Sequence, residues 1–215
     1  MTRKGRAIFM RFTDLVDPKY EADFNTWYAT EHLPELLALP GFLDGARYVA
    51  VHGGPKYLAV LELESLEAIE TAEYKRRTRT PWGDRAAASV IGINRARITG
   101  EQVFPKQVEN PERGMAPALQ IGRMSVPAAV EGDWHAWYNG EYIPGYRTVP
   151  GVICARRYRI AEGEVDYTTV YEFEHERVPE SPEWAYQREH SSPKSGRMRD
   201  VMVMAAGSPG VYRRM

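Results

Sequence analysis

The chain has 215 residues, with 28 basic and 29 acidic side chains and a formal net charge of −1. This balance excludes the strongly basic surface that collects nucleic acid or anionic membranes, and no apolar stretch approaches the about eighteen residues of a membrane span. A single cysteine, Cys154, excludes an intrachain disulfide and a CxxC pair. The opening apolar run breaks at Arg11, too early for a signal peptide. These features predict a cytoplasmic protein whose partner is a small molecule.

The first half predicts alternating strands and helices. Asp17 followed by Pro18 provides an acidic N-cap and a proline at the first helical position. The run Gly53-Gly54-Pro55 predicts a tight turn, and therefore a hairpin. In chain order we expect a strand over 7–13, a helix from 17 that breaks at Pro34 and again at Pro40-Gly41, strands over 43–52 and 56–64, a helix from 65 to 79, and a strand over 94–104.

The second half repeats the first. Segment 24–48 returns as 134–158 at a constant shift of 110 residues, and the register continues to residue 64 without a gap, with 13 of 41 aligned positions identical. So many identities in one register indicate an internal duplication. We expect strands over 118–126, 152–160 and 167–174, helices over 130–146 and 181–190, and a last strand between 199 and 213.

The two units span residues 1–104 and 118–215, and the proline-rich segment 105–117 reads as their linker. Each unit has the order strand, helix, strand, strand, helix, strand. That order predicts an α+β fold of tandem ferredoxin-like repeats, each an antiparallel sheet with both helices on one face. The bare sheet faces are then expected to pack against each other.

The pattern W-Y-x-x-E-H-x-P, followed by a P-G-F turn and an Arg-Tyr strand, resembles the EthD-like branch of the dimeric α/β-barrel superfamily. The residues that carry it are Trp27, Tyr28, Glu31, His32, Pro34, Pro40, Gly41, Phe42, Arg47 and Tyr48. The resemblance covers nearly the whole chain, once per unit, and implies a pseudo-dimeric α/β barrel formed within one chain. Members of the superfamily include cofactor-free monooxygenases, polyketide cyclases, lactone isomerases and haem proteins, so the fold alone barely narrows the chemistry.

A residue kept in both units can be explained by a shared fold, and a residue that differs is a candidate for function. Trp27, Glu31, Arg47 and Tyr57 are kept at the shift of 110. Glu31 and Arg47 are interpreted either as a helix-to-strand ion pair or as part of a site. All four are predicted substrate-binding residues. Trp27, Arg47 and Tyr57, together with Tyr28, are expected to shape a pocket and to steady negative charge.

His32 differs, because its counterpart is Tyr142. On an α-helix Tyr28 and His32 share a face, whereas Glu31 lies about 100° away from His32. A neutral imidazole can remove a proton from a carbon acid or a phenol, and a phenol beside it can hold the developing oxyanion. His32 and Tyr28 are therefore the predicted catalytic residues. The alternative is a histidine that hydrogen-bonds the helix end before Pro34.

The sequence lacks the motifs of metal, nucleotide and thiolate chemistry. The sequence has no HExxH, no nucleotide-binding glycine loop and no thiolate pair, so neither a metal nor a cofactor is expected. Cys154 lies in a predicted strand and is interpreted as a small core residue. The basic run Lys75, Arg76, Arg77 and Arg79 is interpreted as a solvated helix end, with attraction of a carboxylate as the alternative.

The sequence therefore predicts a cofactor-independent isomerase, cyclase or lyase that acts by proton transfer on an apolar, aromatic or polyketide-like carbonyl or phenol compound. The alternatives are a cofactor-free monooxygenase of the same fold and a non-catalytic ligand-binding barrel. A haem site is a third option, and the lack of a histidine common to both units argues against it. A hydrophobic small molecule is the expected partner, nucleic acid and membranes are not, and a homodimer of the chain is left open.

Overall fold

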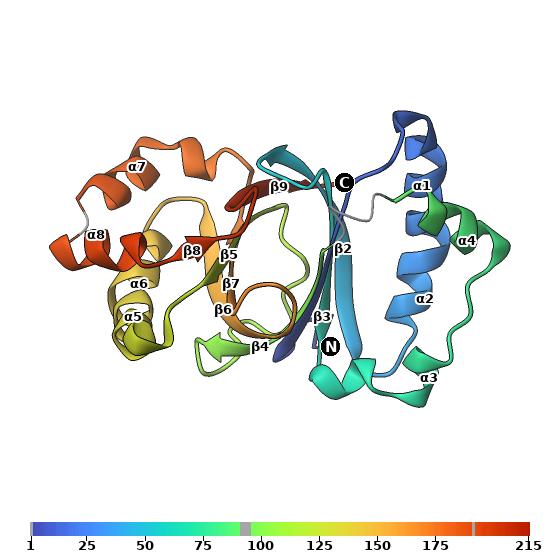
Figure 1. The fold of residues 1–215 in the computed structure, drawn as a ribbon, viewed down its shortest axis with the longest axis horizontal. Coiled ribbons are helices and arrows are strands. Elements are labelled where there is room, and N and C mark those ends of the chain that lie inside the picture. The colour runs from blue at the N-terminus through green and yellow to red at the C-terminus, as the bar shows by residue number, and fades with distance from the viewer. Residues whose placement is uncertain (1, 91–95, 191) are drawn as a thin grey trace.

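Eight strands of the described chain close into an antiparallel barrel that lies between two helical layers (Figure 1). The computed structural model describes residues 2–90, 96–190 and 192–215. Four strands of the first half are ordered β4-β1-β3-β2, and four of the second half are ordered β9-β5-β7-β6. Their bounds are β1 Ala7–Thr13, β2 Phe42–His52, β3 Tyr57–Leu63, β4 Ala96–Phe104, β5 Ala118–Ser125, β6 Val152–Glu162, β7 Tyr167–Phe173 and β9 Gly210–Arg214, and a short β8, Val203–Met204, pairs with the end of β5.

Two pairings between the halves close the barrel within the single chain. β2 pairs with β9, and β4 pairs with β6, both antiparallel. Alternate residues of the strands point inward, where Met10, Leu58, Leu119, Val170 and Tyr158 belong to one buried cluster. Because side chains fill the barrel interior, the space for a ligand lies on the outer sheet faces, beneath the helices.

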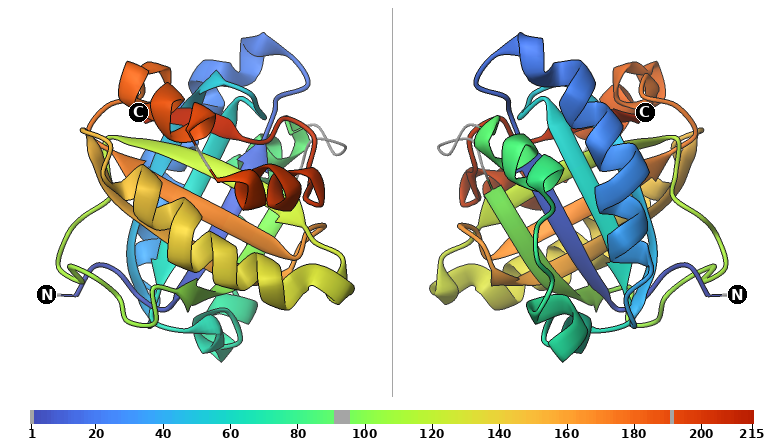
Figure 2. Two further views of the ribbon diagram at one scale, coloured as in Figure 1. Left: turned by 90° about the vertical axis from the view of Figure 1, so that its left-hand side faces the viewer. Right: turned by 90° about the vertical axis from the view of Figure 1, so that its right-hand side faces the viewer.

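Each half covers its outer sheet face with one long helix that contains a π turn (Figure 2). In the first half Leu33 N–H bonds to the carbonyl of Tyr28, five residues back, and in the second Ile143 N–H bonds to Tyr138 in the same way. The helical segments are α1 Glu21–Trp27, the π turn Tyr28–His32, α2 Leu33–Leu37, α3 Ala72–Lys75, α4 Pro81–Ala88, α5 Glu131–Trp137, the π turn Tyr138–Tyr142, α6 Ile143–Arg147, α7 Pro182–Glu189 and α8 Pro193–Asp200, with 3₁₀ turns at Pro18–Tyr20, Leu66–Ile69, Ala128–Val130 and Val178–Glu180.

The predicted helix break at Pro34 is wrong. The helix runs through Pro34 and ends at Leu37, while the second predicted break, at Pro40-Gly41, follows the helix end. Proline lacks an N–H and its ring clashes with the carbonyl four residues back in an α-helix. The π turn just before it already departs from the α-helical bonding pattern, which lets the helix accommodate Pro34.

The second helical segment of each half is longer and more broken than predicted. In place of one helix from 65 to 79, the structure has a 3₁₀ turn, the short α3 and then α4. In the second half α8 follows α7 and was not predicted. Both additional helices begin at a Ser/Thr-Pro pair: Thr80 accepts a bond from Gly83 N–H, and Ser192 accepts one from Ser195 N–H. The strand predicted from 94 begins at Ala96, and residues 94 and 95 lie outside the described residues.

Over the described ranges of the chain, every helix is too short or too polar to cross a membrane.

Candidate active site

Arg47 joins the long helix of the first half to the outer face of the sheet. Its guanidinium carbon lies 4.5 Å from the ring centre of Tyr28 and 5.1 Å from those of Phe24 and Tyr57. Its Nη1 donates to Asn25 Oδ1 at 2.8 Å. The equivalent Arg157 also lies over three aromatic rings. An arginine held between aromatic rings in both halves is explained by packing of the helix on the sheet.

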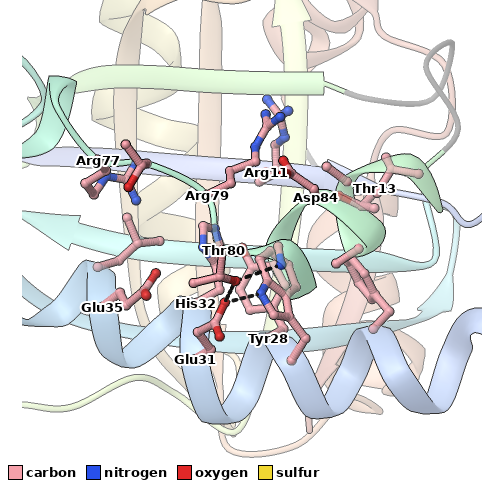
Figure 3. Close-up of a pocket in the computed structure, with 18 of the residues that line it drawn as sticks. Arg11, Thr13, Tyr28, Glu31, His32, Glu35, Arg77, Arg79, Thr80 and Asp84 are labelled. Atoms are coloured by element: carbon pink, nitrogen blue, oxygen red, sulfur yellow. Dashed lines mark hydrogen bonds between the residues drawn. The ribbon is translucent and has the colours of Figure 1, made fainter.

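Glu31 ties the long helix to the start of α4. Its Oε1 accepts hydrogen bonds from Trp27 Nε1 at 2.8 Å and from Thr80 Oγ1 at 2.6 Å (Figure 3). The hypothesised ion pair between Glu31 and Arg47 is not formed. In the second half Glu141 has the same anchoring task, because it accepts hydrogen bonds from Ser195 and Ser192 of the α8 start.

His32 stands beside these anchors without an anchor of its own. Its ring stacks on Trp27, with centres 4.5 Å apart and planes at 17°, and meets Tyr28 edge-on at 4.9 Å. Neither ring nitrogen forms a hydrogen bond to a described residue, and the same holds for the hydroxyl of Tyr28. In the second half Tyr138 receives a hydrogen bond from Thr169, whose first-half counterpart is Ala59. The first half therefore leaves both an imidazole and a phenol unengaged.

These residues open into a cavity of about 730 Å³ between the sheet, the long helix and the segment 74–87. Trp27, Tyr28, Glu31 and His32 all line it. Figure 3 shows Glu31, His32 and Glu35 rising from the helix, with Arg77 and Thr80 across from them. Glu31 and His32 both line the cavity, although successive residues of an α-helix point about 100° apart.

Electrostatics at the cavity disfavour a proton on His32. Burial, together with the positive charge of Arg77, lowers the pKa of His32 from its ordinary value of 6.5 to about 4, against the opposing effect of Glu31. Burial raises the pKa of Tyr28 to about 12. At neutral pH the site therefore presents a neutral imidazole, able to accept a proton, beside a protonated phenol, able to donate a hydrogen bond.

Stability should depend on pH through His32. Above about pH 6.5 the histidine is neutral in both the folded and the unfolded chain. Between that pH and about 4 only the unfolded chain takes up the proton, so the free energy of unfolding falls as the pH falls. We expect His32→Gln to remove this loss, on the order of 1–2 kcal/mol once solvent screening of the half-buried ring is allowed for. Urea unfolding of both proteins at about pH 7 and about pH 4.5 measures it, and an equal stability difference at both pH values contradicts it.

The second half has an opening of about 770 Å³ at the equivalent place, with a different lining. Tyr142 and Tyr146 line it where the first half has His32 and Leu36. Tyr142 lies against Trp137 and Tyr138, with ring centres 4.8 Å from each, and neither of those two residues reaches the opening. The tyrosine thus takes the position from which His32 faces its cavity.

Four of the six predicted site residues come together, and two lie elsewhere. His32, Tyr28, Trp27 and Glu31 line the cavity, whereas Arg47 and Tyr57 are buried behind the helix and do not reach it. The basic run divides, since three of its members line the cavity and Arg76 does not. Sequence reasoning missed Arg11 and Arg97, which line the cavity from adjacent strands. A charged residue inside the apolar strand around Arg11 was the available signal.

No group of three or more potential metal ligands occurs in the part of the chain that the structure describes. Haem is the prosthetic group that the superfamily resemblance implies for some members. His32 is the histidine that lines the cavity, but a metal-ligating histidine normally donates its second ring N–H to a fixed acceptor. His32 has no such partner among the described residues, so the residues present do not fit an axial haem ligand. Cys154 is buried, and burial raises the pKa of its thiol to about 12, which leaves it unreactive.

Known proteins resemble this chain in their fold and not in their sequence. No family model and no curated protein sequence matches the chain. One similar solved structure is that of an anthrone oxidase-like protein, with 12% identity, 100% of this chain and 94% of that chain covered, and a TM-score of 0.57. Another is that of a presumed monooxygenase from Lactobacillus acidophilus, with 10% identity, 97% of this chain and 94% of that chain covered, and a TM-score of 0.55. A mutant chlorite dismutase from Candidatus Nitrospira defluvii is also similar, with 13% identity, 100% of this chain and 93% of that chain covered, and a TM-score of 0.58. At these identities the likeness shows the fold alone, which is that of the dimeric α+β barrels.

Proposed function

We propose that the chain is an EthD-like, cofactor-independent enzyme that moves a proton on a planar apolar carbonyl or phenol compound. The observation that carries the proposal is the pairing of a neutral, unengaged His32 with an unengaged Tyr28 hydroxyl in one cavity. Aromatic side chains on the cavity wall suit a planar substrate. The buried free thiol is compatible with a reducing cytoplasm.

We further propose that residues 1–104 and 118–215 are tandem ferredoxin-like repeats joined by a linker at 105–117. The shift of 110 residues found in the sequence also relates β2 to β6, β3 to β7, and the whole helix from α1 to α2 to that from α5 to α6. A shift shared by the sequence and by five successive elements supports duplication. The EthD-like assignment draws its support from the motif residues Trp27, Tyr28, Glu31 and His32, which line one cavity.

In the proposed reaction His32 takes a proton from the substrate, and the electron pair left behind becomes an enolate or phenolate. Tyr28, which remains protonated, donates a hydrogen bond to that oxyanion, and the guanidinium groups of Arg77 and Arg79 stabilise its charge. An imidazole with a pKa of about 4 is a weak base. The substrate must therefore be acidic in itself, as a phenol is, or a carbon acid whose anion is conjugated with a carbonyl and aryl groups.

Anthrone is a suitable test compound, because it is planar, carries a carbonyl and has an acidic methylene, and because one structural neighbour is named for its oxidation. We expect the protein to accelerate exchange of the methylene hydrogens for deuterium in D₂O without oxygen or any added cofactor, as followed by NMR. Exchange no faster than in buffer contradicts proton transfer.

The same assay in air distinguishes the alternative monooxygenase. An oxygenase would convert one anthrone and one O₂ into one anthraquinone and one water. Uptake of O₂ in an amount equal to the anthraquinone formed would therefore favour the monooxygenase. The test is included because two structural neighbours are named as an anthrone oxidase-like protein and a presumed monooxygenase. Binding of anthrone without exchange or oxidation would leave the non-catalytic barrel.

A further inference from the structure

The floor of the cavity carries two arginines side by side. Arg11 of β1 and Arg97 of β4 are direct partners in the antiparallel register of these strands, and both line the cavity. Directly opposed residues of an antiparallel pair have Cβ atoms about 5 Å apart, and like charges at such positions destabilise a sheet. A sheet that keeps this pair therefore gains from an anion between the two guanidinium groups.

No carboxylate of the described residues forms ion pairs with both arginines. Arg97 Nη2 reaches Glu162 at 3.2 Å, but its Nε is buried without a hydrogen-bond partner. Arg11 forms no hydrogen bond or ion pair with a described residue. Asp84 lies on the same lining and forms no ion pair with a described cation. The floor thus offers the guanidinium of Arg11 and the Nε of Arg97 as donors without an acceptor among the described residues.

The arginine pair belongs to the first half only. By the registers of β5 with β7 and β9, the second-half positions are Gly122 and Pro209, neither of which can hold an anion through its side chain. The pair therefore occurs in the half that holds His32, and in the half where Tyr142 replaces it the pair is absent. A structural need of the barrel would be expected in both halves.

We propose that Arg11 and Arg97 bind a carboxylate group of the ligand, so that the substrate class is a planar aromatic acid. That such an acid is the substrate of the reaction rests on the proposed function, whereas its binding by the two arginines does not. Guanidinium forks match the two oxygens of a carboxylate, and Phe9, over which Arg97 lies at 5.2 Å, gives an apolar surface beside it. The anion is held on the sheet floor, while His32 faces the same cavity from the helix.

The probes are 2-naphthoate and its neutral isostere 2-naphthamide, titrated calorimetrically into the full chain. We expect the wild-type protein to bind naphthoate at least about 10-fold more tightly than naphthamide, with the difference shrinking as salt is raised. Arg11→Gln and Arg97→Gln should each weaken naphthoate binding about 10- to 100-fold and leave naphthamide binding unchanged. Arg76→Gln, an exposed neighbour outside the cavity, is the matched control and should change neither. Asp84→Asn should strengthen naphthoate binding.

A second readout is the melting temperature. Without ligand, relief of the like-charge pair should raise the melting temperature of Arg11→Gln above that of the wild type. At the same naphthoate concentration, the ligand should then raise the melting temperature of the wild type more than that of the variant. Equal binding of the two probes, or unchanged naphthoate affinity in both arginine variants, overturns the inference. Tighter binding of 2-naphthyl phosphate than of naphthoate overturns the assignment to a carboxylate. Anthrone carries no acid group, so its assay is independent of the arginine pair. If the protein does not accelerate deuterium exchange into anthrone, the proposed reaction is contradicted, whereas the result of the naphthoate titrations still stands.

Discussion

Replacing His32 with glutamine is expected to lower proton-transfer turnover about 100- to 10,000-fold, with little change in melting temperature at neutral pH. Glutamine is close to histidine in size and remains polar, but it has no titratable nitrogen to accept the proton. The stacking of His32 on Trp27 is lost, yet the hydrogen bonds that anchor the helix run through Glu31 and are untouched. Deuterium exchange into anthrone measures the rate, and circular dichroism the melting temperature.

The matched control is Tyr142→Phe, at the equivalent position of the second half. It should leave turnover nearly intact, because Tyr142 faces the other opening. The acid limb of kcat/KM should fall near pH 4 and not near 6.5, since burial and Arg77, with Arg79 and Arg47, lower the pKa of His32 more than Glu31 raises it. A fully active but less stable His32→Gln protein would show that the histidine only supports the helix.

Replacing Arg156 with methionine is expected to destabilise the barrel by about 3–5 kcal/mol. Arg156 lies inside the barrel, where it hydrogen-bonds both Glu62 and Glu172. Lys4 reaches Glu172 at 2.5 Å and Glu62 at 3.8 Å, and each of the four side chains is no more than 2% exposed. Burial opposes the charge of Glu172, but Arg156 and Lys4 hold the pKa of that carboxyl below its ordinary value. Without Arg156 two buried carboxylates share one cation.

Thermal and urea unfolding would measure the loss, which corresponds to a fall of roughly 10 °C in a chain of this length. Arg159→Met, an exposed position on the same strand, should change stability by less than about 0.5 kcal/mol. Adding Glu62→Gln to Arg156→Met should restore part of the loss, because one of the stranded charges is removed. A single variant as stable as the wild type would show that water or neighbouring groups solvate the two glutamates.

The repeated strands could be predicted from the sequence because their apolar runs and turn residues are local signals. Tyr57 and Tyr167 begin equivalent strands in the structure, as the shift of 110 requires. The start of α4 could also have been predicted, because Thr80-Pro81 is a helix-start signal of the same kind as Asp17-Pro18, from which a helix was predicted. The π turn was not, because nothing in local propensity marks the five-residue bond from Leu33 to Tyr28.

The candidate site could be predicted only in part, and the reason is distance along the chain. His32 and Tyr28 lie within one helical turn, so their shared face could be inferred. Arg11 and Arg97 are brought together by strand register, which no local pattern specifies at such a separation. Arg47 misled for a different reason, because a charge kept in both halves can be held by aromatic rings as well as by a ligand.

The pairings of β2 with β9 and of β4 with β6 have a consequence for inheritance. A barrel assembled from two copies of one subunit would show every mutation twice, once on each side, and would come apart on dilution. Here both sides are encoded separately and held by covalent linkage, so a mutation changes one side alone. His32, Arg11 and Arg97 accordingly stand on one side where tyrosine, glycine and proline stand on the other, a difference that two copies of one subunit could not have.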